Sequence, residues 1–140
     1  MIDQVKEFFG RYERANSSSD AAAIGELYAE IFTFGGASGV QVIHREDFLK
    51  VVPKRKAYFS SLGISETALD SVEAEAVSSK YVRAKVTWRM TLRDASGERN
   101  LDVLATYVLM RASGEELSIV FQVDHQDLAT VIQEMQNRQG

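Results

Sequence analysis

Residues 81–93 constrain the fold of this chain more than any other stretch. Apolar side chains occupy every second position, and polar or cationic side chains lie between them. The apolar row consists of Val82, Ala84, Val86, Trp88, Met90 and Leu92. This alternation predicts a strand with one buried face and one solvated face. Because parallel sheets are covered on both faces, we predict a one-sided antiparallel sheet.

Helical spacing is found at the start of the chain. The apolar positions are Ile2, Val5, Phe8, Phe9, Tyr12 and Ala15, which line one side of an amphipathic helix. Ser19 or Asp20 is placed to cap a second helix that carries Ile24, Leu27, Tyr28 and Ile31. The two helices are predicted to pack as a hairpin.

A β-hairpin is predicted next, from the β-prone runs 31–34 and 40–44 on either side of a glycine-rich segment, 35–39. A phosphate-binding loop is the alternative for those glycines. Such a loop should lead from a strand into a helix, whereas this segment leads into a second strand. We therefore favour the hairpin turn.

Residues 45–62 return to helical spacing, with the only proline of the chain, Pro53, near their middle. Proline removes a helical hydrogen bond, so a kink or a break into two helices is predicted. The cations of this segment are Lys50, Lys54, Arg55 and Lys56. They could bind an anion, but a solvated helix face is the favoured interpretation.

Three more strands, at 67–77, 101–111 and 117–124, and a closing helix over 128–135 complete the prediction. Turns are expected at 78–80, 94–97 and 113–116. The strand 101–111 is apolar on both faces. One side carries Leu101, Val103, Ala105, Tyr107 and Leu109, and the other carries Leu104, Val108 and Met110. We expect its outer face to meet a partner.

Composition narrows the classes of function. A chain of 140 residues with 45% hydrophobic residues fits a single globular domain, 1–140. It contains no cysteine and two isolated histidines, so we expect no metal and no other cofactor. A net charge of −4 argues against nucleic acid as a partner. We expect a cytoplasmic protein, because there is no secretory signal pattern and no apolar run that would span a membrane.

The order of helix, helix, hairpin, broken helix and antiparallel meander resembles the nuclear transport factor 2-like (NTF2-like) superfamily, which includes SnoaL-like cyclases and ketosteroid isomerases. The segments that carry the resemblance are 8–12, 20–28, 31–34, 45–48 and 120–125. The resemblance implies an α+β, cystatin-like fold. A curved antiparallel sheet would form a cone, three helices from the N-terminal half would close it around an apolar pocket, and a C-terminal helix would follow.

The comparison with ketosteroid isomerases supports only part of a catalytic site. Tyr12 falls where those enzymes carry an oxyanion-binding tyrosine. Their general base falls at Phe34-Gly35-Gly36 in this chain, and their second donor falls near Thr106. Without a base, proton abstraction beside a carbonyl has no agent, so steroid isomerisation is not predicted.

His125 and Tyr12 are the catalytic candidates. His125 has the same parity as Leu117, Ile119, Phe121 and Val123, which predicts a place on the apolar face, and histidine titrates near neutral pH. Asp127 could orient His125, although capping of the following helix is favoured. A buried tyrosine such as Tyr12 can equally bond a backbone carbonyl. The predicted ligand-binding residues are Tyr28, Phe34, Trp88, Met90 and Phe121.

Two hypotheses follow. In the first, the chain binds a small apolar molecule between helices and sheet, with acid–base catalysis by His125 and Tyr12. In the second, it is a non-catalytic interaction or assembly domain that forms a homodimer through its sheet, with the Leu101 to Tyr107 row facing the partner.

Overall fold

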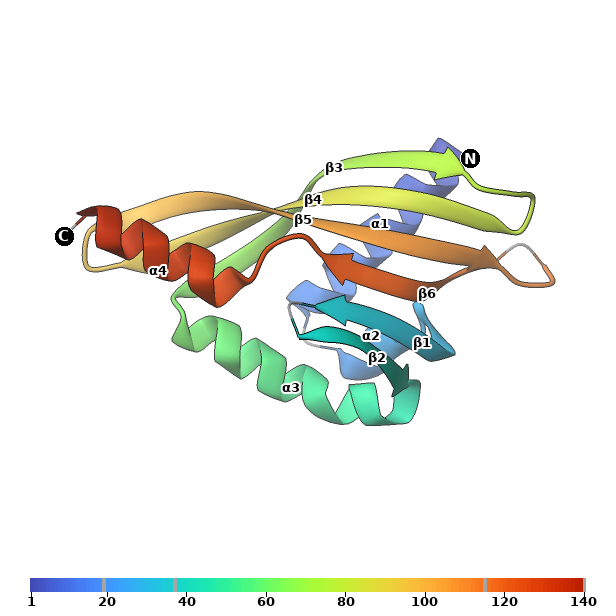
Figure 1. Cartoon of the computed structure of the whole chain (residues 1–140), viewed down its shortest axis with the longest axis horizontal. Coiled ribbons are helices and arrows are strands. Elements are labelled where there is room, and N and C mark those ends of the chain that lie inside the picture. The colour runs from blue at the N-terminus through green and yellow to red at the C-terminus, as the bar shows by residue number, and fades with distance from the viewer. Residues whose placement is uncertain (19, 37, 115, 140) are drawn as a thin grey trace.

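The computed structural model describes residues 1–18, 20–36, 38–114 and 116–139. Its elements, in chain order, are α1 (Ile2–Ser17), α2 (Ala21–Gly25), β1 (Tyr28–Gly36), β2 (Gly39–His44), α3 (Arg45–Ser61), β3 (Ile64–Ala76), β4 (Tyr81–Asp94), β5 (Gly97–Arg111), β6 (Leu117–Asp124) and α4 (Leu128–Gln139). The strands form one six-stranded sheet in the order β2-β1-β6-β5-β4-β3. Figure 1 shows the long β4–β5 hairpin extending past the other strands, with α4 along its end.

The predicted alternation of β4 is confirmed. All six residues of its apolar row are buried, while Arg83, Lys85, Arg89 and Arg93 on the other face are exposed. Three of these cations have partners within the chain. Arg83 pairs with Glu75, Arg89 with Asp70 and Asp102, and Arg93 with Glu98. The outer face of β3 and β4 is therefore a solvated surface of ion pairs.

The sheet is mixed, which corrects the prediction of a wholly antiparallel one. β1 runs parallel to β6 and antiparallel to β2, and the remaining neighbours are antiparallel. Periodicity predicts which face of a strand is buried, but it carries no information on the direction of a neighbour distant in sequence.

The second helix is shorter than predicted. Asp20 caps it by accepting a hydrogen bond from the Ala23 amide at 3.1 Å, and the helix ends at Gly25. Ser19, the alternative cap, lies outside the described residues. Tyr28 begins β1 instead of lying on the helix, and Ile31 is exposed on that strand. Pairing with β2 on one side and β6 on the other explains why these aromatic and β-branched residues form a strand.

The structure also bears on the alternatives at Pro53 and on the start of β3. α3 runs continuously through Pro53, so the break into two helices does not occur, and β3 begins at Ile64, before the predicted start at Thr67. A proline removes one helical hydrogen bond, and packing of Phe48 and Val52 against the core compensates for that loss. Ala37 and Glu115, within two predicted turns, lie outside the described residues.

The interior contains two apolar clusters. The main cluster joins α1, α2, β1 and the first half of α3 to the sheet, and includes Phe9, Phe48 and Trp88. The distal cluster lies under α4, where Met90, Val103 and Ile132 pack with Phe59 at the end of α3. Among the described residues, no helix is long and apolar enough to cross a membrane.

Gly63 offers a test of the junction between α3 and β3. Its φ is +93°, and a Cβ there would lie 2.6 Å from the Arg93 carbonyl oxygen. We expect Gly63→Ala to cost roughly 3 kcal/mol or more of unfolding free energy in urea denaturation, because a backbone clash adds to the left-handed strain. Gly97→Ala is the control, since Gly97 has φ +118° but open space around it. It should lose only about 1 to 2 kcal/mol. Equal losses would contradict the clash.

Candidate functional site

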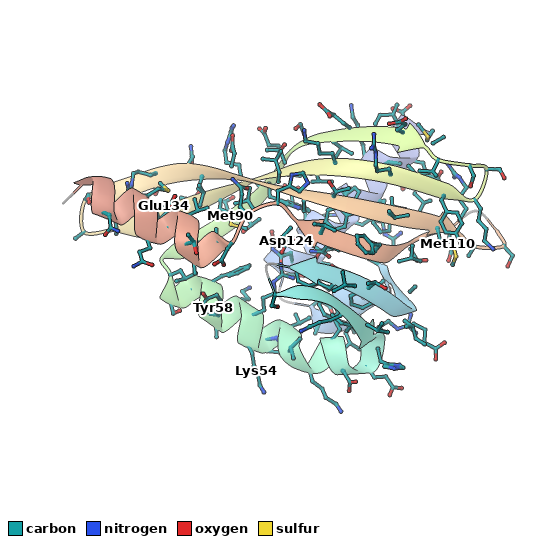
Figure 2. The ribbon with its side chains drawn as sticks, in the orientation of Figure 1. Lys54, Tyr58, Met90, Met110, Asp124 and Glu134 are labelled. Carbon is teal, nitrogen blue, oxygen red and sulfur yellow. The ribbon has the colours of Figure 1, made fainter. Side chains whose placement is uncertain are left out.

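A layer of polar side chains lies where the two apolar clusters meet. Along α3 the inward face carries Phe48 and Val52 in the main cluster and Phe59 in the distal cluster, with Arg55 between them. At the end of β6, Asp124 pairs with Ala105 of β5. Figure 2 shows Asp124 where the chain leaves the sheet towards α4. The groups that contribute to this layer, named the polar layer below, are Tyr12, Tyr28, Arg55, Trp88, Tyr107, Gln122 and Asp124.

A chain of hydrogen bonds crosses the interior from α1 to β6. Tyr28 donates its hydroxyl proton to Gln122 Oε1 at 2.6 Å, and Gln122 Nε2 donates to Asp124 Oδ1 at 3.2 Å. The hydroxyls of Tyr12 and Tyr28 are 2.8 Å apart. Because a phenol has a single proton and that of Tyr28 is committed to Gln122, Tyr12 must be the donor in this bond. The donors in this series of hydrogen bonds, Tyr12, Tyr28 and Gln122, therefore all point towards the Asp124 carboxylate.

Tyr107 retains an uncommitted proton. Its oxygen accepts a hydrogen bond from Trp88 Nε1 at 3.1 Å, while among the described residues no acceptor bonds its hydroxyl hydrogen. The side chain is 2% exposed. A buried hydroxyl with an unused proton is a donor available to a bound molecule.

Arg55 is the second available donor. Its guanidinium carbon lies over the Phe59 ring, 5.2 Å from the centroid, and within the described part of the chain it donates no hydrogen bond and forms no ion pair. The side chain as a whole is half-buried. Desolvation of the guanidinium acts to lower the pKa of Arg55, but Tyr12, Tyr28 and Asp124 outweigh it and raise that pKa. The arginine is therefore charged, and its charge interacts with groups of the polar layer.

Burial raises the pKa of the Tyr28 and Tyr107 phenols well above the ordinary value. Desolvation is the largest cause for both, and the neighbouring Tyr12 phenol adds to it. Arg55 acts in the opposite direction on both groups but does not outweigh burial. Both phenols stay protonated near neutral pH and act as hydrogen-bond donors.

The structure brings together three of the predicted site residues. Tyr12, Tyr28 and Trp88 are all buried, and the Tyr12 ring lies 6.1 Å from that of Tyr28 and 5.4 Å from that of Trp88. Phe34 is half-buried on the same face of the sheet, because it pairs with Gln122. Met90 lies apart from them, buried in the distal cluster under α4.

The predicted inward placement of His125 and Phe121 is wrong. Val108 pairs with Phe121 and Leu109 with Ile119, which leaves Val120 as an extra residue in a β-bulge. Beyond the bulge the parity of β6 is reversed, so Gln122 is buried and Phe121 faces outwards.

His125 accordingly is exposed on the outer face, with Nε2 2.6 Å from the Thr106 hydroxyl oxygen. It is separated from Tyr12 by the sheet. Asp127 accepts a hydrogen bond from the Thr130 hydroxyl at the start of α4, as expected of a capping residue. The geometry gives no support to a His125–Asp127 catalytic pair.

Four members of the polar layer were not predicted as site residues from the sequence: Arg55, Tyr107, Gln122 and Asp124. For Arg55 a signal existed, because positions 48, 52, 55, 59 and 62 share one helix face and only 55 is charged. For Gln122 and Asp124 no signal was available, since one unpaired residue in β6 decides their face.

Two open hollows lie on the surface beside α1. One, of about 540 Å³, includes Glu13, Arg14 and Thr67 in its lining, and the other, of about 420 Å³, includes Arg11, Ala23 and Glu26. No group of the polar layer lines either hollow. In the described ranges, no group of three or more histidine, aspartate or glutamate side chains could hold a metal ion.

Residues 3–135 match the family described as NTF2-like protein (DUF6841), so the chain belongs to this family. The predicted superfamily and the α+β cystatin-like fold are thereby confirmed. No curated protein matches the chain in sequence.

Solved structures share the fold at low sequence identity. Aln2 from a Streptomyces species is 19% identical with a TM-score of 0.72, and the match covers 93% of each chain. An NTF2-like protein with a cystatin-like fold from Novosphingobium aromaticivorans is 13% identical with a TM-score of 0.70, over 93% of this chain and 86% of the other. An NTF2-like protein of unknown function from Shewanella oneidensis is 14% identical with a TM-score of 0.67, over 88% and 97%. At these identities the likeness establishes the fold alone.

Tyr28→Phe tests the hydrogen-bonded chain. The change leaves Gln122 Oε1 without its donor and Tyr12 without its acceptor, so we expect a loss of about 1 to 3 kcal/mol in urea denaturation. Tyr58→Phe is the matched control, because Tyr58 is 48% exposed. It should change stability by less than about 0.5 kcal/mol. A Tyr28→Phe chain as stable as the control would show that the buried bonds contribute nothing.

Alkaline titration tests the raised phenol pKa values. Folded Tyr28 and Tyr107 keep protons that the unfolded chain loses above pH about 10, so their stabilising contribution is present below that pH and is lost as pH rises through the folded pKa. We expect ultraviolet titration to show a late phenolate step, coincident with unfolding, for at least two of the five tyrosines. Tyr28→Phe and Tyr107→Phe should each reduce that step. Complete ionisation of all tyrosines before unfolding would refute the assignment.

Proposed function

We propose that this chain binds a small, mostly apolar molecule between α1, α3 and the sheet, with the polar end of that molecule at the polar layer. The observation that carries the proposal is the pair of uncommitted donors, Arg55 and Tyr107, in aromatic surroundings. Ligand sites in proteins are typically apolar with a few convergent polar groups of this kind. The predicted residues Tyr12, Tyr28, Phe34 and Trp88 keep a lining role in the proposal, and Met90 lines its distal side.

Ala105 is a small, buried side chain at the proposed site. It pairs with Asp124 across β5 and β6 and is two residues from Tyr107 on the same face. Side chains of directly paired residues lie about 5 Å apart, so the Ala105 methyl borders the Asp124 carboxylate. An acid–base step at this site would use Asp124 as the base and Tyr107 as the donor, because His125 lies on the other face of the sheet.

Trp88 supplies a direct test, since it is the only tryptophan of the chain and bonds Tyr107. We expect titration with benzamide or phenylbutanamide to change its fluorescence, and native mass spectrometry of the purified protein to detect a bound small molecule. Ala105→Leu should abolish the response by filling the site, whereas Ala57→Leu, at an exposed position of α3, should retain it.

Two controls make this test decisive. Circular dichroism shows whether the Ala105→Leu variant is folded. If it is unfolded, Tyr107→Phe, which removes only the hydroxyl, serves as the site variant instead. Saturable binding that both site variants leave unchanged would refute the proposed location.

A second candidate function is a homodimer formed through the outer face of the sheet. This face carries a continuous apolar patch, here named the outer patch, on β2, β1, β6 and β5. Its members are Ile31, Val40, Val42, Leu104, Val108, Met110, Phe121 and Val123. Ile31 is 52% exposed and Val40 and Val42 are each 68% exposed, which is unusual for a contiguous group.

The predicted partner row needs a correction in this candidate. Val103, Ala105 and Tyr107 are buried inside the chain, so the opposite row of β5 would meet the second copy. A two-fold contact would place the outer patch of one copy on that of the other.

Val42→Lys combined with Val108→Lys tests the dimer. We expect the unaltered chain to have the mass of a dimer in light scattering and the double variant that of a monomer, because lysine ammonium groups would have to be buried. Val77→Lys, at a 64% exposed valine in the β3–β4 turn, should remain dimeric. A monomeric unaltered chain at micromolar concentration would refute this candidate.

A further inference from the structure

A charged guanidinium interacts with groups of the polar layer without an ion-pair partner among the described residues. We propose that the ligand of this site is an apolar carboxylic acid, whose carboxylate is bound by Arg55 and Tyr107. This inference rests on the proposed function, since it assigns a chemical class to the molecule bound there.

The guanidinium of Arg55 carries a charge that no described residue pairs. Arg55 is half-buried, and in the described part of the chain it has neither a salt bridge nor a hydrogen bond. Desolvating an ion is costly unless a counter-charge or hydrogen bonds compensate. Asp124 interacts with Arg55 electrostatically but is not close enough to form an ion pair. A ligand carboxylate would supply a counter-charge to this half-buried guanidinium.

The position of the Arg55 guanidinium suits a carboxylate. The Phe59 ring covers one face of the guanidinium, at 5.2 Å from its centroid, and leaves the N–H edges unused. A guanidinium edge presents two parallel donors that match the two oxygens of a carboxylate. The Tyr107 hydroxyl supplies a further donor that the described residues do not use. A carboxylate, which accepts several hydrogen bonds, suits these donors better than a single neutral carbonyl.

Arg55 is placed differently from the lysines of α3. The lysines of this helix, Lys50, Lys54 and Lys56, are exposed, and Figure 2 shows Lys54 extending away from the sheet. Arg45, at the start of the helix, is half-buried and donates to the Tyr28 carbonyl oxygen at 3.3 Å. Arg55 lies on the helix face that carries Phe48, Val52 and Phe59 and, unlike Arg45, donates no hydrogen bond to a described residue. The charge therefore lies on the inward face of the helix beside the Phe59 ring, and the apolar side chains of that face would contact the apolar body of the acid.

The charge of Asp124 allows us to predict whether a substitution there strengthens or weakens the binding of a carboxylate. Its carboxylate is held by Gln122 Nε2 at the border of the site, where it would repel a bound anion. Removing its charge with Asp124→Asn should therefore tighten the binding of a carboxylate several-fold. A neutral analogue should not show that gain.

The experiment compares acids with their amides, which have the same shape and lack the charge. The probes are benzoate and benzamide, cyclohexanecarboxylate and cyclohexanecarboxamide, and phenylbutanoate and phenylbutanamide, titrated calorimetrically against the full chain at neutral pH. We expect at least one acid to bind about tenfold or more tightly than its amide, the usual effect of a charge-assisted bond. Arg55→Gln should reduce that preference to less than about twofold, whereas Lys54→Gln, which removes an equal charge from an exposed position, should preserve it.

The outcomes separate the two proposals. Equal binding of acids and amides, with both lost in Ala105→Leu, would overturn the carboxylate assignment and leave the binding site standing. Absence of binding for all six probes would overturn both. An acid preference that persists in Arg55→Gln, or weaker binding of the acid in Asp124→Asn, would show that the anion is held elsewhere. The comparison on the unaltered chain needs no variant to fold.

Discussion

The set of β6 side chains that faces the core changes at Val120. Odd-numbered residues such as Ile119 face the core before it, and even-numbered residues such as Gln122 face the core after it. The cause is the β-bulge, in which Val120 has no partner on β5. Ile119 is buried on one side of the bulge and Gln122 on the other, although they differ in parity. The interior hydrogen bonds and the outer patch both depend on this change, because it turns Gln122 and Asp124 inwards and Phe121 and His125 outwards.

Burying the groups of the polar layer costs free energy unless they form hydrogen bonds, so it matters which of them have partners. A buried hydroxyl or amide without a partner costs roughly 1 to 3 kcal/mol, so natural cores satisfy such groups or omit them. Here the Tyr12, Tyr28 and Gln122 groups are bonded in one direction, towards Asp124. Within the layer, Arg55 and Tyr107 are the exceptions, and the proposed ligand site is built on them. Tyr12, Tyr28, Trp88 and Tyr107 of the layer belong to the main cluster, and Arg55 lies on α3 between Val52 of the main cluster and Phe59 of the distal one.

Membership of the NTF2-like family establishes the scaffold and leaves the activity open, because one fold hosts many functions. The inference about function therefore rests on particular groups. A guanidinium on the inward face of α3 and a phenol proton that no described residue accepts are chemical features of this chain, independent of the likeness to solved structures. They also move the candidate chemistry away from His125, which the sheet separates from the interior.

The amino-acid sequence by itself determined the elements whose pattern is local and strong. The alternation of β4, the apolar face of α1 and the turn at Gly97 each follow from the spacing of side chains along one element. The superfamily followed from the order of those elements.

Tertiary structure alone decided the features that depend on contacts between distant segments. Strand pairing ended α2 early and placed Tyr28 on β1, and the parallel alignment of β1 and β6 joined segments from opposite ends of the chain. The unpaired Val120 then reversed the parity on which the prediction of His125 rested. The physical reason is that spacing along a strand defines a face only while every residue is paired, and a bulge is a property of two strands together.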